Sequence, residues 1–580
     1  MIEREPQSIP AVAEPPAARP RRRRAGSVDT SLLELSDTRI HEPQRIAASE
    51  HGMVSTAHYS ATAAGVQMLE RGGNAIDAAV AAALALGVCE PAASGLGGQT
   101  MMVIHDAASG RTVALDGSSR APNRALVERF ANLTADRRRG HLATTVPSSP
   151  AVYAHALAHY GKLDWSTVCE PAIVLAEEGY EVSLLQYRLT RRERRRLAAH
   201  SGSQFFLQDG RRAYRAGTII TQPVLARTLR RLCEQGFEDF YLGETARLIG
   251  EDMEANGGIV LADDLAQIPH PIERRPLSVR FGRDRVLTMP LPGAGRTLVE
   301  MLNIHQSLPR ELQDIDTPEG AVCLAETIRL ALIDRKDRPF DPNLYSPASD
   351  KQMLNREYAR GLASGVAQRF GHGETTHLSV MDAHGNVVAL TQSIENVYGS
   401  CAASSELGFL YNNYMSAFQT TDVSHPYYLR PNAVPWASVA PTIVFRSSEP
   451  WLAIGSPGSE RIPPTILQVL LRLRNSSPMA AVDAPRIHCS LQGEVSVEAS
   501  RIATDVLVAL EDAGLVLNRR EPYSFYLGCA QLVMRDGGRL IGVADPRRDG
   551  AAAGPVSVPA PASMPDTGSG PAPAPSPEPA

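Results

Sequence analysis

The segment "GETTHLSVMDAHGNVVALTQS" (Gly373–Ser393) has the pattern of a β-hairpin, in which two apolar runs flank the turn sequence Asp-Ala-His-Gly. Two threonines, Thr375 and Thr376, stand at the start of the first run, directly behind Gly-His-Gly-Glu. One interpretation is that threonine simply favours strands. The other is that the chain cleaves itself between Glu374 and Thr375, so that Thr375 becomes a new amino terminus.

The second interpretation has a chemical rationale. A threonine hydroxyl is a weak nucleophile at neutral pH and needs a base beside it. The α-amino group of an N-terminal threonine has a pKa of about 7.7–8.0 and can accept the hydroxyl proton. Two glycines ahead of Glu374 allow the chain to bend, so that the Thr375 hydroxyl can attack the Glu374 carbonyl. The local pattern alone leaves both interpretations open, and it favours a core or surface position for His377.

Composition excludes several classes of function. The chain has 580 residues, of which 43% are hydrophobic and 21% are charged, as in ordinary globular proteins. The formal net charge is −5, so no global basic field indicates a nucleic-acid partner. Seven cysteines occur without a CxxC motif, and no His or carboxylate spacing is typical of a metal site. We therefore expect no metal, no cofactor and no nucleic acid.

The two ends differ in composition from the rest of the chain. Residues 1–42 are basic and Pro-rich, and residues 549–580 are rich in Pro and Ala, so we expect both to be disordered. No apolar stretch follows Arg21–Arg24, as a secretory signal would require. The longest apolar run, Ala78–Val88, is too short to cross a bilayer and indicates a buried helix. These features predict a cytoplasmic protein without a membrane segment.

The pattern between the ends predicts an α+β fold. Helices are expected over 61–69, 75–88, 151–160, 166–178, 222–235 and 297–307, and again over 464–473 and 503–513. Strands are expected in the hairpins over 100–117 and 376–394, and over 442–445, 451–454 and 531–534. Two strand-rich layers covered by helices would form a four-layer αββα sandwich. The Arg-rich run 191–196 is expected to be a solvated helix face.

Two glycine-rich stretches are candidates for ligand-binding motifs. The sequence SGLGGQT (94–100) lacks the spacing and the later acidic residue of a dinucleotide site. The sequence GSPGS (455–459) is not a G-x-S-x-G nucleophile elbow. It can present backbone N–H groups to an oxyanion, or it can be a plain turn.

Many segments, in this order, resemble the γ-glutamyltransferase (γ-glutamyltranspeptidase) family of N-terminal nucleophile hydrolases. They include ERGGNAIDAAVAAALALGV (70–88), GAGRTLVEMLNI (293–304), TTHLSVMDAHGNVVALTQSI (375–394), LGFLYNNYM (407–415), GSPGSERI (455–462) and ADPRRDG (544–550). The resemblance covers about residues 52–547. It implies an αββα fold and a precursor that cleaves itself before Thr375. The products would be a large subunit (43–374) and a small subunit (375–548), paired as a heterodimer.

The resemblance also implies the roles of individual residues. Thr375 would be the nucleophile both for self-cleavage and for catalysis, through an acyl-enzyme formed with a small-molecule substrate. Ser393 stands where the family has a threonine that hydrogen-bonds the nucleophile. Gly458 and Ser459 stand where the family has a Gly-Gly pair whose backbone forms the oxyanion hole, and their N–H groups can serve in the same way.

Several departures from the family pattern fall on the donor pocket. Ser118 stands at a family arginine, and Arg120, two residues on, is the candidate replacement. Glu395 replaces an asparagine, and in the segment "YMSAF" that begins at Tyr414, Ser416 and Ala417 replace two aspartates. Of a family Ser-Ser pair only Ser438 remains. Losing a buried charged contact typically costs a few kcal/mol of recognition, about two or more decades in affinity. The candidate donor-binding residues are Arg120, Glu395, Tyr414 and Ser438.

Three functions remain open from the sequence. The first is a hydrolase or acyltransferase acting on γ-glutamyl-like, glutaryl or other acidic acyl groups. The second is a C–C bond hydrolase of a specialised-metabolite pathway, of the kind that makes alkylproline-containing antibiotics. The third is a non-catalytic scaffold that has kept the fold.

Overall fold

The computed structural model describes residues 44–337 and 374–556. The predicted disordered leader (1–42) lies outside these ranges, and so do residues 557–580 of the predicted tail. The tail prediction is wrong at its beginning, because strand β19 (Ala551–Ala553) pairs antiparallel with β2 (Gly52–Thr56). Three alanines carry little strand propensity, so no local pattern predicts this edge strand.

Fourteen of the strands in the described ranges form two antiparallel sheets. The first sheet has the order β1 (Ile46–Ser49), β18 (Arg539–Ala544), β17 (Gln531–Asp536), β13 (Glu449–Gly455), β12 (Thr442–Arg446), β9 (Asp284–Thr288) and β8 (Leu277–Phe281). The second has the order β19, β2, β10 (Glu374–Asp382), β11 (Val387–Glu395), β3 (Gln99–Asp106), β4 (Arg111–Gly117) and β7 (Ile272–Arg274).

The two sheets pack face to face around a shared core. Met53, Val103 and Ala389 from the second sheet lie in one buried cluster with Ile443 and Leu452 from the first. Alternate residues along each strand point into this interior. The hairpin predicted from Gly373–Ser393 forms β10 and β11, which lie at the centre of the second sheet.

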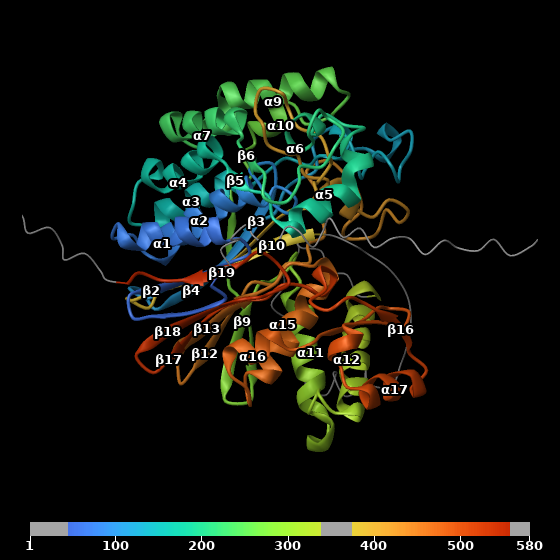
Figure 1. The fold of residues 1–580 in the computed structure, drawn as a ribbon. Helices are drawn as coiled ribbons and strands as arrows, with labels where there is room; N and C mark the ends of the chain where they lie inside the picture. Colours follow the sequence, from blue (N-terminus) through green and yellow to red (C-terminus); the bar gives the residue numbers. More distant parts are fainter. Residues whose placement is uncertain (1–43, 338–373, 557–580) are drawn as a thin grey trace, which may run out of the picture. The chain divides into compact units, whose positions relative to one another are not determined.

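Helices cover the outer face of each sheet (Figure 1). Against the second sheet and beyond it lie α1 (Tyr59–Glu70), α2 (Ala75–Cys89), α3 (Ser149–Tyr160), α4 (Trp165–Glu178), α5 (Leu184–Leu197), α7 (Pro223–Gln235) and α9 (Glu244–Ala255). Against the first lie α11 (Gly295–Ser307), α12 (Pro318–Asp337), α15 (Ile462–Arg472), α16 (Pro478–Asp483) and α17 (Thr504–Asp512). The layer order is therefore αββα, as predicted.

Helix α2 shows how the sequence builds one of these layers. Asn74 caps it through a capping box with Asp77, which satisfies the free N–H groups of the first turn. All of its residues except Gly87 are classed as buried, as expected for the apolar run Ala78–Val88. Its many alanines allow close packing against α1, α4 and the hairpin β10–β11. In α5, by contrast, Arg191, Arg192 and Arg194–Arg196 are exposed, as expected of a solvated face.

Three smaller units complete the described chain. Strands β14 (Ile487–Cys489), β15 (Glu494–Val497) and β16 (Val516–Arg519) form a three-stranded sheet beside α12 and α17. Strands β5 (Tyr180–Glu181) and β6 (Ile219–Ile220) form a two-stranded ladder. Short helices α6 (Ser203–Phe206), α8 (Asp239–Leu242) and α10 (Ala262–Leu265) connect the larger ones.

Candidate active site

Thr375 lies at the start of the central strand β10, and its side chain is buried, with 4% of the residue exposed. Its hydroxyl Oγ1 donates a hydrogen bond to Oγ of Ser393 on β11, at 3.4 Å. Oγ of Ser393 also accepts the backbone N–H of Glu395 at 2.8 Å.

The pairing of β10 with β11 is irregular at Thr375. Glu374 pairs with Glu395 but Thr376 pairs with Gln392, so the register slips by one residue between them. Glu395, at the end of β11, has a backbone φ of +77°, in the left-handed region that residues other than glycine rarely adopt. Bulges and strained residues of this kind redirect side chains and gather at functional sites. Here the irregularity falls on the proposed scissile bond.

Tyr414 extends the hydroxyl cluster around Ser393. It begins the short helix η5 (Tyr414–Ala417), and its buried hydroxyl lies near the side chains of Ser393 and Gln99. Gln99 in turn accepts the backbone N–H of Ser119 at 2.9 Å. Burial raises the pKa of Tyr414, and the nearby carboxylate of Glu395 raises it further. The phenol therefore stays protonated and can donate a hydrogen bond at neutral pH.

Gly458 and Ser459 lie in a tight turn after β13, here called the Gly458 loop (residues 456–459). Both have positive φ, +121° at Gly458 and +55° at Ser459. Oγ of Ser456 donates to the Pro457 carbonyl at 2.8 Å and accepts the N–H of Cys529 at 2.9 Å. These bonds fix the turn that carries the predicted oxyanion-binding N–H groups.

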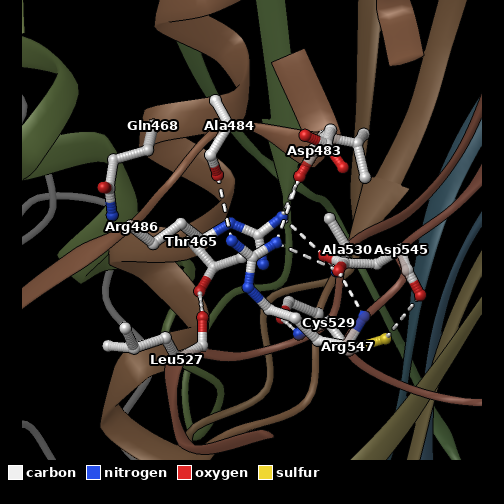
Figure 2. A network of polar contacts seen from close by, with 12 residues as sticks. Thr465, Gln468, Asp483, Ala484, Arg486, Leu527, Cys529, Ala530, Asp545 and Arg547 are labelled. Atoms are coloured by element: carbon white, nitrogen blue, oxygen red, sulfur yellow. Dashed lines mark hydrogen bonds and ion pairs between the residues drawn. The ribbon is translucent and has the colours of Figure 1, made fainter. Parts of the chain in front are cut away.

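A buried ionic network anchors the segment that supports this loop (Figure 2). The guanidinium of Arg547 binds Glu498 through two bonds of 2.7 and 2.6 Å, and it binds Asp545 at 3.1 Å. Asp545 also accepts from Arg486 at 2.5 Å and from the N–H of Ala530 at 2.7 Å. Ala530 follows Cys529 directly, so the network holds the donor that binds Ser456.

His377, two residues after Thr375, is a buried core histidine. Its ring nitrogens hydrogen-bond the hydroxyls of Thr391 at 2.8 Å and Ser379 at 3.1 Å. Burial lowers the pKa of His377 to about 3, so the imidazole is neutral at physiological pH. A neutral imidazole with both nitrogens hydrogen-bonded has a structural role, in keeping with the core position that the strand pattern favours.

The predicted donor-pocket residues fall into two groups. Glu395 and Tyr414 lie near Ser393 of the hydroxyl pair, and Ser438 accepts a hydrogen bond from Nη2 of Arg335 at 3.3 Å. Arg120 is placed by a backbone bridge to Val146, and within the described ranges its guanidinium has no hydrogen-bond or ion-pair partner. The side chain of Glu374 lies outside what the structure describes.

Two residues of this region had no place in the sequence prediction. Gln99 directly follows the glycine-rich run Ser94–Gly98, whose pattern points to a ligand-binding loop and not to a hydrogen-bond partner of Ser119. Arg335 lies near the end of α12, a helix that the sequence analysis did not identify. Arg335 precedes Thr375 by forty residues, so no local sequence pattern indicates that its side chain reaches the loop of Ser438.

Two further properties bear on the class of site. Among the residues that the structure describes, no three His, Cys, Asp or Glu side chains gather closely enough to hold a metal ion. Within the same ranges, no helix combines the length and apolar character needed to cross a membrane.

Two stacked antiparallel sheets between helical layers, with a hydroxyl cluster at the start of a central strand, define the fold of the N-terminal nucleophile hydrolases. A family model described as gamma-glutamyltranspeptidase matches residues 61–555. The chain belongs to this family, and it is an enzyme of the hydrolase and transferase type that the family comprises.

Individual relatives bear different names. The "Glutathione hydrolase proenzyme" of Escherichia coli (strain K12) is 31% identical, over 86% of this chain and 91% of the relative. The "Acylase ACY 1 proenzyme" of Pseudomonas sp. (strain SE83) is 32% identical, over 76% of this chain and 83% of the relative. The crystal structure of a cephalosporin acylase from Bacillus halodurans is similar, with a TM-score of 0.81 and 28% identity over 90% of this chain and 98% of that chain.

Proposed function

We propose that the chain is a self-processing acyl hydrolase or acyltransferase in which Thr375 is the nucleophile and the donor pocket differs from that of ordinary glutathione breakdown. The observation that carries the proposal is the Thr375–Ser393 hydroxyl pair at the one-residue slip between β10 and β11. It puts an oriented, buried hydroxyl next to the Glu374–Thr375 peptide bond, at the point where the strand register slips.

This geometry supports self-cleavage at the Glu374–Thr375 bond. Oγ1 of Thr375 attacks the carbonyl carbon of Glu374, the hydroxyl proton passes to the peptide nitrogen, and the C–N bond breaks so that this nitrogen becomes the amino group of Thr375. Glu374 is then held as an ester on Thr375. Water hydrolyses the ester, which leaves a carboxylate on Glu374 and a free N-terminal threonine. Large and small subunits, 43–374 and 375 to the end, would remain associated through the shared sheets.

Turnover uses the same atoms. The free amine of Thr375 accepts the hydroxyl proton as Oγ1 attacks the donor's acyl carbonyl, and it returns that proton to the departing amine. The backbone N–H groups of Gly458 and Ser459 would stabilise the oxyanion of the tetrahedral intermediate. Ser393 accepts a hydrogen bond from Oγ1 and thereby orients it. Water completes hydrolysis, and an amine in its place completes transfer.

The altered pocket is supported by residue identity and by the relatives. Ala417 and Ser118 stand where the family places a carboxylate and an arginine for the γ-glutamyl donor, and neither can supply a charge. Relatives named acylases match this chain about as well as those named glutathione hydrolases. They support acyl transfer, and C–C bond cleavage in an antibiotic pathway is the second candidate function, which the similar structure titled "Structure of LmbA2991T421A" supports (25% identity, TM-score 0.78). The non-catalytic scaffold has no support among these relatives.

The test is the covalent state of Thr375. Purified protein is analysed on a denaturing gel, and the expected result is two bands, near two thirds and one third of the 62.4 kDa chain mass. Mass spectrometry should find Thr375 at the amino terminus of the smaller one. Thr375→Ala should stay as one band, and Thr375→Ser should still cleave because it keeps a hydroxyl.

Thr376→Ala is the matched control. The Thr376 hydroxyl is buried and, within the described residues, has no hydrogen-bond partner, so its removal should not prevent cleavage. An uncleaved 374–375 bond in active wild-type protein would falsify the proposal.

A further inference from the structure

Asn413 contacts both of the peptide groups that flank Glu395. Its backbone N–H donates to the Ile394 carbonyl at 3.2 Å, and its side-chain Oδ1 accepts the N–H of Asn396 at 3.0 Å. The Ile394 carbonyl belongs to the peptide before Glu395, and the Asn396 N–H belongs to the peptide after it. Because peptide groups are planar, the orientations of these two define φ and ψ of Glu395. Asn413 therefore holds both sides of the residue whose φ is +77°.

The first of these two peptides also reaches the nucleophile. The N–H of Glu395 donates to Oγ of Ser393 at 2.8 Å, and the same Oγ accepts from Oγ1 of Thr375 at 3.4 Å. The peptide thus has its carbonyl on Asn413 and its N–H on Ser393. A rotation of this peptide would turn the N–H away from Ser393 and release the hydroxyl that orients Thr375. One peptide group and one hydroxyl form the path from Asn413 to the nucleophile.

The amide of Asn413 suits this position. Nδ2 donates to the Arg138 carbonyl at 2.9 Å, while Oδ1 accepts from Asn396. The two partners require one donor and one acceptor, which an amide supplies and a carboxylate or an alkyl side chain does not. Asn413 is fully buried, so the loss of either bond would leave a buried polar group without its partner. Arg138 precedes Thr375 in the chain, so the amide also connects the proposed large and small subunits.

The left-handed backbone of Glu395 needs such contacts. A β-carbon disfavours this conformation, and glycine, asparagine and aspartate adopt it far more often than glutamate does. A strained residue persists only where the surrounding contacts determine its conformation. Further along the chain, Tyr398 is also left-handed, with φ +61°, and its contacts are different ones: its N–H donates to the Ala92 carbonyl at 2.9 Å, and its hydroxyl lies 2.5 Å from that of Thr190. The contacts that determine the conformation of Glu395 are those of Asn413.

We propose that Asn413 is a positioning residue for the nucleophile. It holds Glu395 in the left-handed conformation, which keeps the Glu395 N–H on Ser393 and the Ser393 hydroxyl on Thr375. The inference rests on the proposed function and adds to it a residue that acts through Glu395 and Ser393. Because Asn413 acts on the nucleophile and not on the donor, its loss should lower the rate of self-cleavage, which involves no donor, and kcat, with little change in KM.

The test measures self-cleavage in two backgrounds. Precursors are pulse-labelled during cell-free translation, so that each starts intact, and the two product bands are followed on a gel. Asn413→Ala should slow cleavage by about ten- to a hundred-fold in the wild-type background. In the Glu395→Gly background it should slow cleavage by no more than a few-fold, because glycine adopts positive φ without a penalty from a β-carbon. The same fold loss in both backgrounds overturns the inference, since it would show no coupling between Asn413 and the backbone of Glu395.

Asn412→Ala is the matched control. This neighbouring amide is equally buried, but it bonds Thr145 and the Gly97 carbonyl instead of the peptides that flank Glu395. Whatever Asn412→Ala does to cleavage, the fold loss should be the same in the wild-type and Glu395→Gly backgrounds. A rescue as large as that of Asn413→Ala overturns the inference, because it would show that Glu395→Gly relieves any damage nearby. Asn413→Leu, which is close to asparagine in shape and has no polar atoms, replaces Asn413→Ala if that variant does not fold.

Crystallography separates this inference from the proposed function. If the wild-type protein stays uncleaved, the proposed function fails, and the backbone of Glu395 then decides the role of Asn413. Crystal structures are compared for Thr375→Ala with and without Asn413→Ala. An extended Glu395 whose N–H has turned away from Ser393 in the double variant supports the inference. A positive φ at Glu395 in both structures overturns it.

Discussion

The imidazole of His377 fills the space that a β-carbon on Gly455 would occupy. An ideal β-carbon there would lie 2.2 Å from Cε1 and 2.4 Å from Nδ1 of the ring. His377 follows Thr375 by two residues in one sheet, and Gly455 precedes Gly458 by three in the other. A single contact between the sheets therefore joins the strand of the nucleophile to the loop that would bind the oxyanion.

Gly455→Ala is expected to impair self-cleavage strongly, because the added methyl group must push the two sheets apart or displace the ring. Overpacking of this kind typically costs about 1–3 kcal/mol. His377→Ala alone removes two hydrogen bonds and leaves a cavity. The double variant should recover part of the cleavage rate, since the methyl group then occupies the emptied space. The rate is measured by densitometry of the two bands, and additive losses in the double variant would argue against direct contact.

Acid should destabilise the fold partly through His377. The pKa of His377 is lowered by burial to about 3, whereas an unfolded histidine titrates near 6.5. Between these values the unfolded chain binds a proton that the folded chain does not, so stability falls as the pH falls through that window. One such group accounts for about 2 kcal/mol between pH 7 and pH 5.

His377→Asn should therefore flatten the pH dependence, whatever it does to stability at pH 7. The comparison is made in the Thr375→Ala background, where the chain stays in one piece, by urea unfolding at pH 5 and pH 7. His58 and His305, whose pKa values burial lowers to about 4, remain in both proteins and contribute equally. Parallel pH profiles of parent and variant would show that His377 does not resist protonation.

The Gly458 loop predicts opposite outcomes for neighbouring substitutions. Gly458 has φ +121°, where a β-carbon is strained, so Gly458→Ala should slow turnover and cleavage. Ser459 has φ +55°, and Ser459→Gly relieves its left-handed strain while it keeps the N–H group. Steady-state kinetics should show a loss of at least tenfold for the first and a change of no more than a few-fold for the second. Similar losses in both would indicate that the Ser459 side chain itself matters.

Ser393 is expected to orient the nucleophile rather than to bind the donor. Ser393→Ala removes the acceptor of the Thr375 hydroxyl and leaves the N–H of Glu395 without its partner. We expect kcat to fall by about ten- to a hundred-fold with little change in KM, because one oriented hydrogen bond is worth about 1–3 kcal/mol. Ser393→Thr should restore most of the rate. A change confined to KM would instead place Ser393 in the donor pocket.

Local periodicity predicted the elements of this fold well where they are regular. The hairpin of Thr375 and the apolar helix after Asn74 follow directly from alternation and from caps. The one-residue slip at Thr375 does not, because it depends on the left-handed backbone of Glu395, which no residue preference favours. The contact of His377 with Gly455 and the approach of Arg335 to Ser438 join segments 78 and 103 residues apart. Such contacts follow from how layers pack, and the resemblance to a family did not supply them. It did supply the relation between Thr375 and Ser393, which local pattern could not.

The network around Arg547 should set the stability of the small-subunit region. Arg547, Glu498 and Asp545 are fully buried, and Arg547 binds both carboxylates. Arg547→Met takes one partner from each carboxylate, while Asp545 keeps Arg486 and Glu498 keeps Arg501. Breaking a buried pair in this way costs about 3–5 kcal/mol. Arg547→Lys should rescue little, because an ammonium cannot reproduce the paired bonds to Glu498.

The matched control is Arg519→Met. The ion pair of Arg519 with Glu511 is about half exposed and should contribute no more than about 1 kcal/mol. Thermal unfolding in the Thr375→Ala background measures the Tm change that each substitution causes. Equal Tm changes for Arg547→Met and Arg519→Met would mean that the ion pairs of Arg547 only offset the cost of burying its charge. Because the network also holds Ala530 and, through Cys529, the Ser456 end of the Gly458 loop, Arg547→Met should slow self-cleavage even at temperatures where the chain stays folded.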